Sequence, residues 1–558
     1  MRSRSRLRQG LFASVATASL TIAGAAAASP ADEAARDARI AKLEAAVAAL
    51  QGLAAQNQTL ERQNAELEGE VGQLQAQVAD LKATTVTQLD DVRQTAANLP
   101  RVSFPNGRPT LASADGRFTA SLRGQLQLDT AAYLQSAAGP TASDLRRDGP
   151  ALGASATNVD AAHARNLKDG TLWRRARIGF DGTAYGDWDY RLLFDFGGSG
   201  VEDAGQLYEG WLQYSGLKPF HVRIGAWPQP IGLEDQMSTN SQLFLERPGI
   251  SDVARGLAAG DTRIGAGVFG YDNGWFVSAD VTGRTIGVVN TGTVITSTPG
   301  AVGAAQTFGD QIGVVARGVV TPFHGPDWRV NVGVHGSYVD RPGNTGGPAA
   351  SGLIPASAFG VRLRDTPELR VDGTQFIDTG SIPTHNAGTI GGEIAAQKGP
   401  LFAEAEYESL HVSRADGIAS PSFSGWYVEG SWLLTGESRL YNASTAAFDG
   451  PTVKHPFSLA DHGPGAWELA FRYSDANLNF DPGAPGSSPL ADSIRGGDQK
   501  VWSVGLNWYP NQVFHFMLDY DHVEIDRLSP NAAVFATPVG AQIGQTYDVV
   551  AVRSQAAF

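Results

Sequence analysis

The sequence has no cysteine among its 558 residues. This absence excludes disulfide scaffolds, Cys-ligated zinc, iron–sulfur clusters and cysteine nucleophiles. Charge is also sparse, at 18 % of residues against about 25 % in ordinary soluble proteins. The 43 basic residues are outnumbered by 57 acidic ones, and the resulting net charge of −14 argues against a general nucleic-acid-binding protein.

Long hydrophobic runs are missing too, except at the amino terminus. Four arginines between Arg2 and Arg8 precede an apolar run that ends in Ala26-Ala27-Ala28. A basic start, an apolar stretch and small residues at the cleavage point predict a signal peptide over residues 1–28. The alternative is a membrane anchor, but the Ala, Ser and Thr content makes this run weakly apolar. If the mature chain spans a membrane, it must do so with strands.

Catalytic motifs are absent as well. We find no phosphate-binding loop ending in Gly-Lys-Ser/Thr, no His-Glu-x-x-His and no Gly-x-Ser-x-Gly. Gly265, Gly267 and Gly270 match the dinucleotide fingerprint, but no helix pattern follows them to hold a phosphate. These glycines are better explained by crowding within a barrel wall. The sequence therefore predicts neither an enzyme nor a bound cofactor or metal.

What the sequence does contain begins with a helical heptad pattern over about residues 41–84. The heptad positions called a fall at 43, 50, 57, 64, 71 and 78, and those called d fall at 46, 53, 60, 67, 74 and 81. Polar Asn57 and Asn64 interrupt this otherwise apolar seam. One helix cannot bury such a seam, so residues 29–85 are predicted to form a self-associating coiled coil. The alternative is an amphipathic helix packed on its own domain. Val at a with Leu at d favours a dimer.

A linker is predicted over residues 86–115, where Pro100, Pro105 and Pro109 interrupt any helix. From residue 116 onwards the period of the apolar residues changes to two. In one segment Trp188, Tyr190 and Leu192 alternate with Asp189 and Arg191. Comparable runs lie at 118–128, 176–180, 220–224, 328–335, 502–508 and 514–520. Such alternation over about 9–12 residues fits tilted strands that cross a bilayer.

The connectors between these runs alternate in length. Short, turn-like joints lie at 182–187, 215–219, 271–274, 398–400 and 509–511, and long Gly- and Pro-rich loops lie at 135–170, 228–261, 284–308, 341–386 and 475–499. Tight turns at one end and long loops at the other are typical of outer-membrane barrels. Residues 116–558 are thus predicted to form an antiparallel transmembrane β-barrel of about sixteen strands. Only residues 437–465 break the pattern, because the alternation predicts a tight turn there and the segment is long. Either the number of strands is wrong at this point or the turn carries an insertion.

Several blocks resemble a known family. They are residues 173–196 (WRRARIGFDGTAYGDWDYRLLFDF), 220–248, 433–441, 465–474 and 504–511 (VGLNWYPN), and they resemble the phosphate-selective porins of the O and P type. The resemblance implies a sixteen-stranded barrel, a homotrimer in outer-membrane lipid, and passive diffusion of small anions, including phosphate. It places the coiled coil in the periplasm as an accessory that either holds the trimer together or reaches toward the cell wall.

Arginines recur on the strand faces that point away from lipid. They are Arg175, Arg177, Arg191, Arg223, Arg263, Arg317, Arg329, Arg472 and Arg553. A column of guanidinium groups would draw anions and replace their hydration with paired hydrogen bonds. In the alternative interpretation, inward acids pair with these arginines and leave a general or sugar-type porin with little anion selectivity; the candidates are Asp195, Glu209, Glu393, Glu429 and Asp519.

The resemblance also implies that the third loop of the barrel folds inward and forms the constriction. In this chain that loop is residues 228–261. Its charges are mixed. The acidic residues are Glu234, Asp235, Glu246 and Asp252, and the basic ones are Arg247 and Arg255. Phosphate-selective relatives are often described with constriction lysines, and this loop has none. The sequence therefore leaves the physiological solute open.

Overall fold

The computed structural model describes residues 30–135, 167–198, 206–258, 262–286, 311–342, 360–380, 382–414, 417–529 and 539–558. The chain divides into two units, residues 1–97 and residues 98–558, and each is described by itself. The predicted signal peptide, residues 1–28, lies outside the described residues.

The first unit is one helix, α1 (Pro30–Asn98), of 69 residues. It continues through residues 86–98, part of the predicted linker, because the first proline after Pro30 is Pro100. The apolar seam is open to solvent in the single chain, with Leu43 64 % and Leu81 69 % exposed. No helix in the described ranges has the length and apolar character needed to cross a membrane.

The remainder of the predicted linker is ordered. Strand β1 (Arg101–Ser103) pairs with β2 (Thr110–Ala112), and a short 3₁₀ helix, η1 (Pro105–Gly107), connects them. Proline at the first position of a helix loses no hydrogen bond, which explains why Pro105 begins η1. Because β2 also pairs with the first barrel strand, this hairpin extends the wall.

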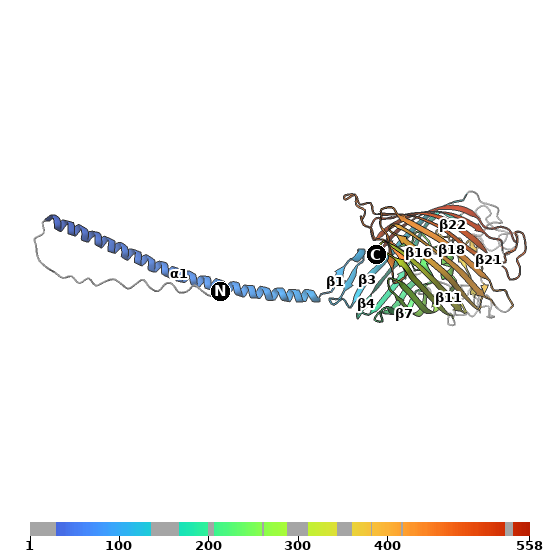
Figure 1. Cartoon of the computed structure of the whole chain (residues 1–558), viewed down its shortest axis with the longest axis horizontal. Coiled ribbons are helices and arrows are strands. Elements are labelled where there is room, and N and C mark those ends of the chain that lie inside the picture. Colours follow the sequence, from blue (N-terminus) through green and yellow to red (C-terminus); the bar gives the residue numbers. More distant parts are fainter. Residues whose placement is uncertain are drawn as a thin grey trace, which may run out of the picture. The chain divides into compact units, whose positions relative to one another are not determined.

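The second unit is a closed antiparallel barrel of sixteen strands, as predicted (Figure 1). Each strand pairs with the next, and pairing of the last with the first closes the wall at Ala551 and Ala131. The strands are β3 (Thr119–Leu134), β4 (Gly170–Ala184), β5 (Trp188–Asp195), β6 (Gln206–Tyr214), β7 (Phe220–Pro228), β8 (Thr262–Tyr271), β9 (Trp275–Thr285), β10 (Ile312–His324), β11 (Trp328–Asp340), β16 (Asn386–Lys398), β17 (Leu401–Ser413), β18 (Ser422–Leu433), β21 (Ala466–Phe480), β22 (Ile494–Tyr509), β23 (Phe514–Asp526) and β24 (Thr546–Ala557).

The alternation of the sequence sets the two faces of this wall. On β4, Ile178 and Phe180 are 50 % and 51 % exposed on the outer face, whereas Arg177, which precedes Ile178, is buried inside. Gly267, in the false dinucleotide motif, lies on β8, and a Cβ there would come within 1.7 Å of Asp280 Oδ1. A side chain at this position would have to displace the Asp280 carboxylate, so glycine relieves crowding here.

The long connector at residues 434–465 is an insertion, and the strand count is unaffected. It holds the hairpin β19 (Arg439–Asn442) and β20 (Ala447–Pro451), whose buried Phe448 packs on Phe402 of β17 at 4.9 Å between ring centroids. The predicted loop at 475–499 is shorter than expected, since β21 and β22 remain paired as far as Phe480 and Ile494.

Two loops fill much of the barrel interior. The third loop carries α2 (Leu233–Gln236), α3 (Gly249–Arg255) and η3 (Gly256–Ala258). The fifth, between β11 and β16, carries the short pairs β12 (Gly360–Val361) with β15 (Ile382–Pro383) and β13 (Arg364–Asp365) with β14 (Ile377–Asp378). Ile250, Phe376 and Ile377 of these loops form an apolar core with the wall residues Leu410 and Val549.

Candidate functional site: the constriction loop and an arginine-lined cavity

The third loop crosses the interior and is tied to strands around the barrel. The backbone N–H of Leu233 donates to Glu406 on β17 at 2.8 Å, and that of Leu245 donates to Asp519 on β23 at 2.7 Å. Gln127 on β3 donates to the Thr239 carbonyl at 3.0 Å, and Gln555 on β24 donates to the Asn240 carbonyl at 3.0 Å. The loop is thus fixed inside the barrel, as expected for a constriction.

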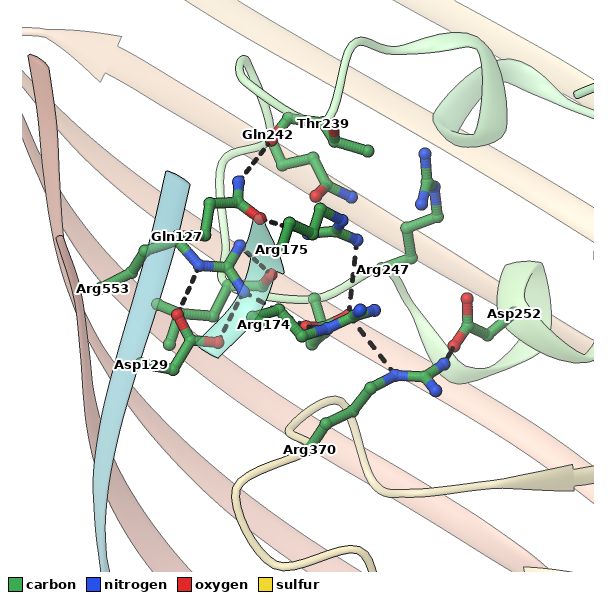
Figure 2. Close-up of polar contacts among 12 residues, drawn as sticks. Gln127, Asp129, Arg174, Arg175, Thr239, Gln242, Arg247, Asp252, Arg370 and Arg553 are labelled. Carbon is green, nitrogen blue, oxygen red and sulfur yellow. Dashed lines mark hydrogen bonds and ion pairs between the residues drawn. The ribbon is translucent and has the colours of Figure 1, made fainter. Parts of the chain in front are cut away.

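Glu246 is the centre of this attachment. Four arginines surround its carboxylate: Arg174 is hydrogen-bonded to it, Arg553 lies at 3.2 Å, Arg370 at 3.6 Å and Arg175 at 4.0 Å. Figure 2 shows these arginines converging from the wall and from the fifth loop. Burial alone would raise the pKa of Glu246, but the charges of Arg174 and Arg175 hold it well below its ordinary value. Glu246 therefore stays ionised and joins three parts of the chain.

A β-bulge in β4 supplies one of these arginines. Gln127 pairs with Arg175 but Leu128 pairs with Trp173, so Arg174 is the extra residue. Trp173 is 52 % exposed, whereas Arg174 and Arg175 both reach the third loop. Strict alternation assigns only one of two adjacent arginines to the interior, and for this reason it does not predict that Arg174 points inward.

Five of the nine predicted inward arginines are fully buried, at no more than 2 % exposed, and hold the fold together. Their partners are carboxylates, an amide and loop carbonyls: Arg553 with Asp129 at 2.7 Å, Arg317 with Glu393 at 2.7 Å, Arg472 with Glu368 and with Glu429 at 3.6 Å, Arg175 with Gln127 at 2.6 Å, and Arg263 with the Arg255 carbonyl at 3.0 Å. Arg329, near a tight turn, lies over Tyr441 at 3.8 Å. Pairing with inward acids, the alternative interpretation of the sequence, thus holds for Arg317, Arg472 and Arg553, and two of the acids named there, Glu393 and Glu429, take part.

Three more of the nine, Arg177, Arg191 and Arg223, line a cavity of about 740 Å³ between strands β3–β9 and the third loop. Arg247 and Arg255 of the loop also line it, as do Arg108 and Arg123, so that seven arginines face one space. Burial, together with the neighbouring Arg191 charge, lowers the pKa of Arg108. Positive charges gathered around one cavity attract an anion from solution.

Aromatic rings hold several of these guanidinium groups flat. Arg177 lies 3.6 Å over Tyr208, and Arg223 lies 4.3 Å over Trp211 and 4.8 Å over Phe269. Stacking leaves the edge of a guanidinium, with its N–H donors, available in the ring plane. Arg223 also donates to Gln213 at 2.7 Å and 3.0 Å. The donors are thus preorganised before a solute arrives.

Carboxylates share the cavity and temper its charge. Arg177 pairs with Asp195 at 2.7 Å and Arg191 with Glu209 at 3.1 Å. Six acids line the space: Asp181, Asp189, Glu209, Asp235, Asp280 and Asp449. Asp195, which pairs with Arg177, lies outside this lining. The cavity is therefore mixed in charge, with arginines and acids in nearly equal number.

Comparison with known proteins is consistent with this geometry. The family model "Phosphate-selective porin O and P" matches residues 150–549. The chain belongs to this porin family. Porin O of Pseudomonas aeruginosa is 27 % identical over 389 residues, covering 66 % of this chain and 79 % of that protein. An uncharacterized protein of Caulobacter vibrioides is 23 % identical over 453 residues, covering 80 % of this chain and 77 % of that protein.

Solved structures are more distant. The anion-selective porin from Comamonas acidovorans is 13 % identical, with a TM-score of 0.40 over 79 % of this chain and all of that one. The outer membrane channel DcaP of Acinetobacter baumannii is 9 % identical, also with a TM-score of 0.40, over 79 % of this chain and 97 % of that one. The family match places this porin in the outer membrane and indicates a channel rather than an enzyme.

Of the four loop residues predicted at the constriction, three line the cavity and one does not. Asp235, Arg247 and Arg255 line the cavity, and Arg255 approaches Asp235 at 2.9 Å. Glu234 is 2 % exposed and points elsewhere, accepting from Gln242 at 3.0 Å. Asp252 completes the loop by pairing with Arg255 at 3.0 Å and with Arg370. Burial would raise the pKa of Asp252, but Arg370 and Arg255 lower it to about 2.

Sequence reasoning missed four arginines of this porin. Arg123 follows the inward phase of β3 and could have been found from it. Arg108 lies in the predicted linker, Arg370 in the fifth loop and Arg174 at the bulge, where alternation carries no information. Three aromatic residues also lie inside the barrel: Trp227 and Phe269 line the cavity, and Tyr427 is 0 % exposed.

Proposed function

We propose that this porin lets small anions, phosphate included, diffuse passively through the arginine-lined cavity beside its third loop. The observation that carries the proposal is the gathering of Arg108, Arg123, Arg191 and Arg223 on one open space. Guanidinium edges form paired hydrogen bonds with phosphate oxygens and replace its hydration shell. The carboxylates beside them keep the bound state weak enough for the anion to leave.

A second candidate is a pore for neutral solutes such as sugars. It is favoured by one observation, a stack of rings in which His221 lies 4.9 Å from Phe269 and 5.2 Å from Tyr271, at interplanar angles of 16° and 8°. The two aromatic rings line the cavity. The guanidinium of Arg223, however, lies over Phe269, so the ring face meets a cation. A preference for oligosaccharides over anions in liposome swelling would support this candidate instead.

The test is inhibition of chloride current by phosphate in planar bilayers. Wild type and the double variant Arg191→Gln with Arg223→Gln are titrated with phosphate at fixed ionic strength. We expect phosphate to reduce the wild-type current and to lose at least about tenfold in apparent affinity in the variant, because two charge-assisted contacts are removed. Arg364→Gln, an exposed loop arginine outside the cavity, is the matched control. Equal inhibition of all three proteins would contradict the proposal.

We further propose a homotrimer in outer-membrane lipid with the coiled coil in the periplasm. The exposed seam of α1 supports self-association, since an isolated helix leaves it in water. The segments are then a signal peptide at 1–28, a coiled coil from 29 that runs beyond residue 85 to residue 98, and a barrel from 116 to 558. Contact of the coiled coil with the cell wall is the alternative use of the same segment. No enzymatic activity or cofactor is proposed.

A further inference from the structure

Three buried carboxylates meet where the third loop contacts the wall on the β17 and β18 side. They belong to Glu234 in α2, Glu404 in β17 and Glu429 in β18. One oxygen from each lies within 4.8 Å of the others, and the residues are 2 %, 2 % and 3 % exposed. None of the three lines the arginine cavity, so this cluster is a separate feature of the interior.

The cluster has oxygens without partners. Oε2 of Glu234, Oε2 of Glu404 and Oε1 of Glu429 are fully buried and accept no hydrogen bond from the described residues. Their other oxygens are contacted by Gln242 at 3.0 Å, by the Tyr427 hydroxyl at 3.0 Å and by Arg472 at 3.6 Å. The amide oxygen of Gln242, itself 2 % exposed, is also without a partner. Buried acceptors left unsatisfied are costly and require an explanation.

A neighbouring acidic group shows what is missing. Glu393, Glu406 and Glu408 surround His335, whose ring nitrogens lie 3.0, 3.5 and 2.6 Å from them, and Arg317 also pairs with Glu393. That group contains its own cations. In the Glu234 cluster only Arg472 comes within 4.0 Å of a carboxylate, and it also serves Glu368. Among the described residues, Arg247 and Arg439 also act on Glu234 by charge, but neither forms an ion pair with a carboxylate of this cluster.

We propose that Glu234, Glu404 and Glu429 bind a hard divalent cation of the calcium type, which fastens the third loop to β17 and β18. Calcium takes 6–8 oxygen ligands at about 2.3–2.6 Å, so oxygens around one ion lie at most about 5 Å apart, and the observed spacing fits. The cluster offers six carboxylate oxygens and no nitrogen or sulfur ligand, which disfavours zinc and copper.

The ion would offset the negative charge of the cluster and would link the third loop to the barrel wall. Glu234 belongs to the loop, whereas Glu404 and Glu429 lie opposite each other in paired strands. Attachment at this point complements the arginines around Glu246, which hold the loop from the β3, β4 and β24 side.

The experiment uses the full-length protein in detergent, stripped with EDTA and titrated with terbium(III) at pH 8. Tyr427, whose hydroxyl contacts Glu404, should sensitise terbium luminescence, and calcium should displace it. We expect one calcium-displaceable site per chain, weakened at least about tenfold by Glu404→Gln or Glu429→Gln. Glu408→Gln is the control, because it lies on the same strand, is equally buried and contacts His335 instead.

Luminescence that is unchanged by Glu404→Gln and Glu429→Gln, or absent from the wild type, would overturn the proposal and leave protons as the only neutralising species. If a wall variant fails to assemble, Glu234→Gln replaces it, because that residue lies in the loop and outside the strands. Displacement by magnesium but not by calcium would also contradict the proposed ion type. The readout does not depend on anion conduction, so it stands apart from the function proposed above.

Discussion

At the scale of single residues, two inward arginines of one strand serve different purposes. Arg175 is 2 % exposed, donates to Gln127 at 2.6 Å and lies 4.0 Å from Glu246. Arg177 lines the cavity over Tyr208. The alternation predicts that both point inward, and they do. Which of them meets a solute depends on where the third loop settles, and this is set by contacts with residues more than sixty positions away.

This division predicts different phenotypes for the two residues. Arg177→Gln should reduce the preference for anions, and its effect on stability should be the smaller of the two, because Asp195, which loses its partner, still accepts from two backbone N–H groups. Arg175→Gln should lower stability by about 1–3 kcal/mol, because it breaks a buried, charge-assisted network. Reversal potential and the melting temperature in detergent measure the two effects. Reversed outcomes, with Arg177→Gln unstable and Arg175→Gln altering selectivity alone, would refute the assignment.

At the scale of elements, the third loop is held by charges that no local pattern shows. Glu246→Gln should cost about 3–5 kcal/mol, since it leaves four arginines without their shared anion. The loop should then fluctuate and produce noisier single-channel currents. Glu524→Gln, in an exposed pair with His522, is the control and should stay within about 0.5 kcal/mol of wild type. Quiet currents from Glu246→Gln would show that apolar packing alone fixes the loop.

Acid should weaken the same loop through Asp252. Its pKa is lowered from 3.8 to about 2 in the folded protein, so its contribution is complete above about pH 4 and is lost as the pH falls to 2. The contribution is about 2 kcal/mol at neutral pH. Melting temperatures of wild type and Asp252→Asn from pH 5 to pH 2 measure it, and the difference between them should shrink toward pH 2. A difference that is independent of pH would contradict the pairing of Asp252 with Arg370.

How much of these elements the sequence predicts depends on the range of the interaction. The wall strands, their faces and the tight turns follow from alternation and turn residues, which are local. The bulge at Arg174, the inserted hairpin 439–451 and the fifth-loop pairs β12–β15 and β13–β14 come from contacts between distant segments. Residues 437–465 show the limit, because the sequence reveals a departure from the pattern but cannot choose between a slipped count and an insertion.

At the scale of the whole molecule, the two units can be separated by deletion. Removal of residues 30–98 takes away α1 and leaves the β1–β2 hairpin on β3, together with the contact between Arg108 and Asp181. We expect the shortened protein and the full chain alike to form closed barrels whose migration in denaturing gels shifts on heating. Native gels then show whether the proposed trimer survives, which we expect because barrel walls bury most of such an interface. Monomeric migration would assign trimer formation to the coiled coil.

The central claim is that the arginine-lined cavity makes this porin prefer anions. The most direct measurement is the reversal potential of the mature wild-type protein in a planar bilayer across a KCl gradient. The structure predicts a potential with the sign of chloride permeation, which falls toward zero when Arg191→Gln and Arg223→Gln are combined. A wild-type potential near zero, or one with the sign of potassium permeation, would contradict the claim and leave a barrel whose arginines serve only to hold its loops.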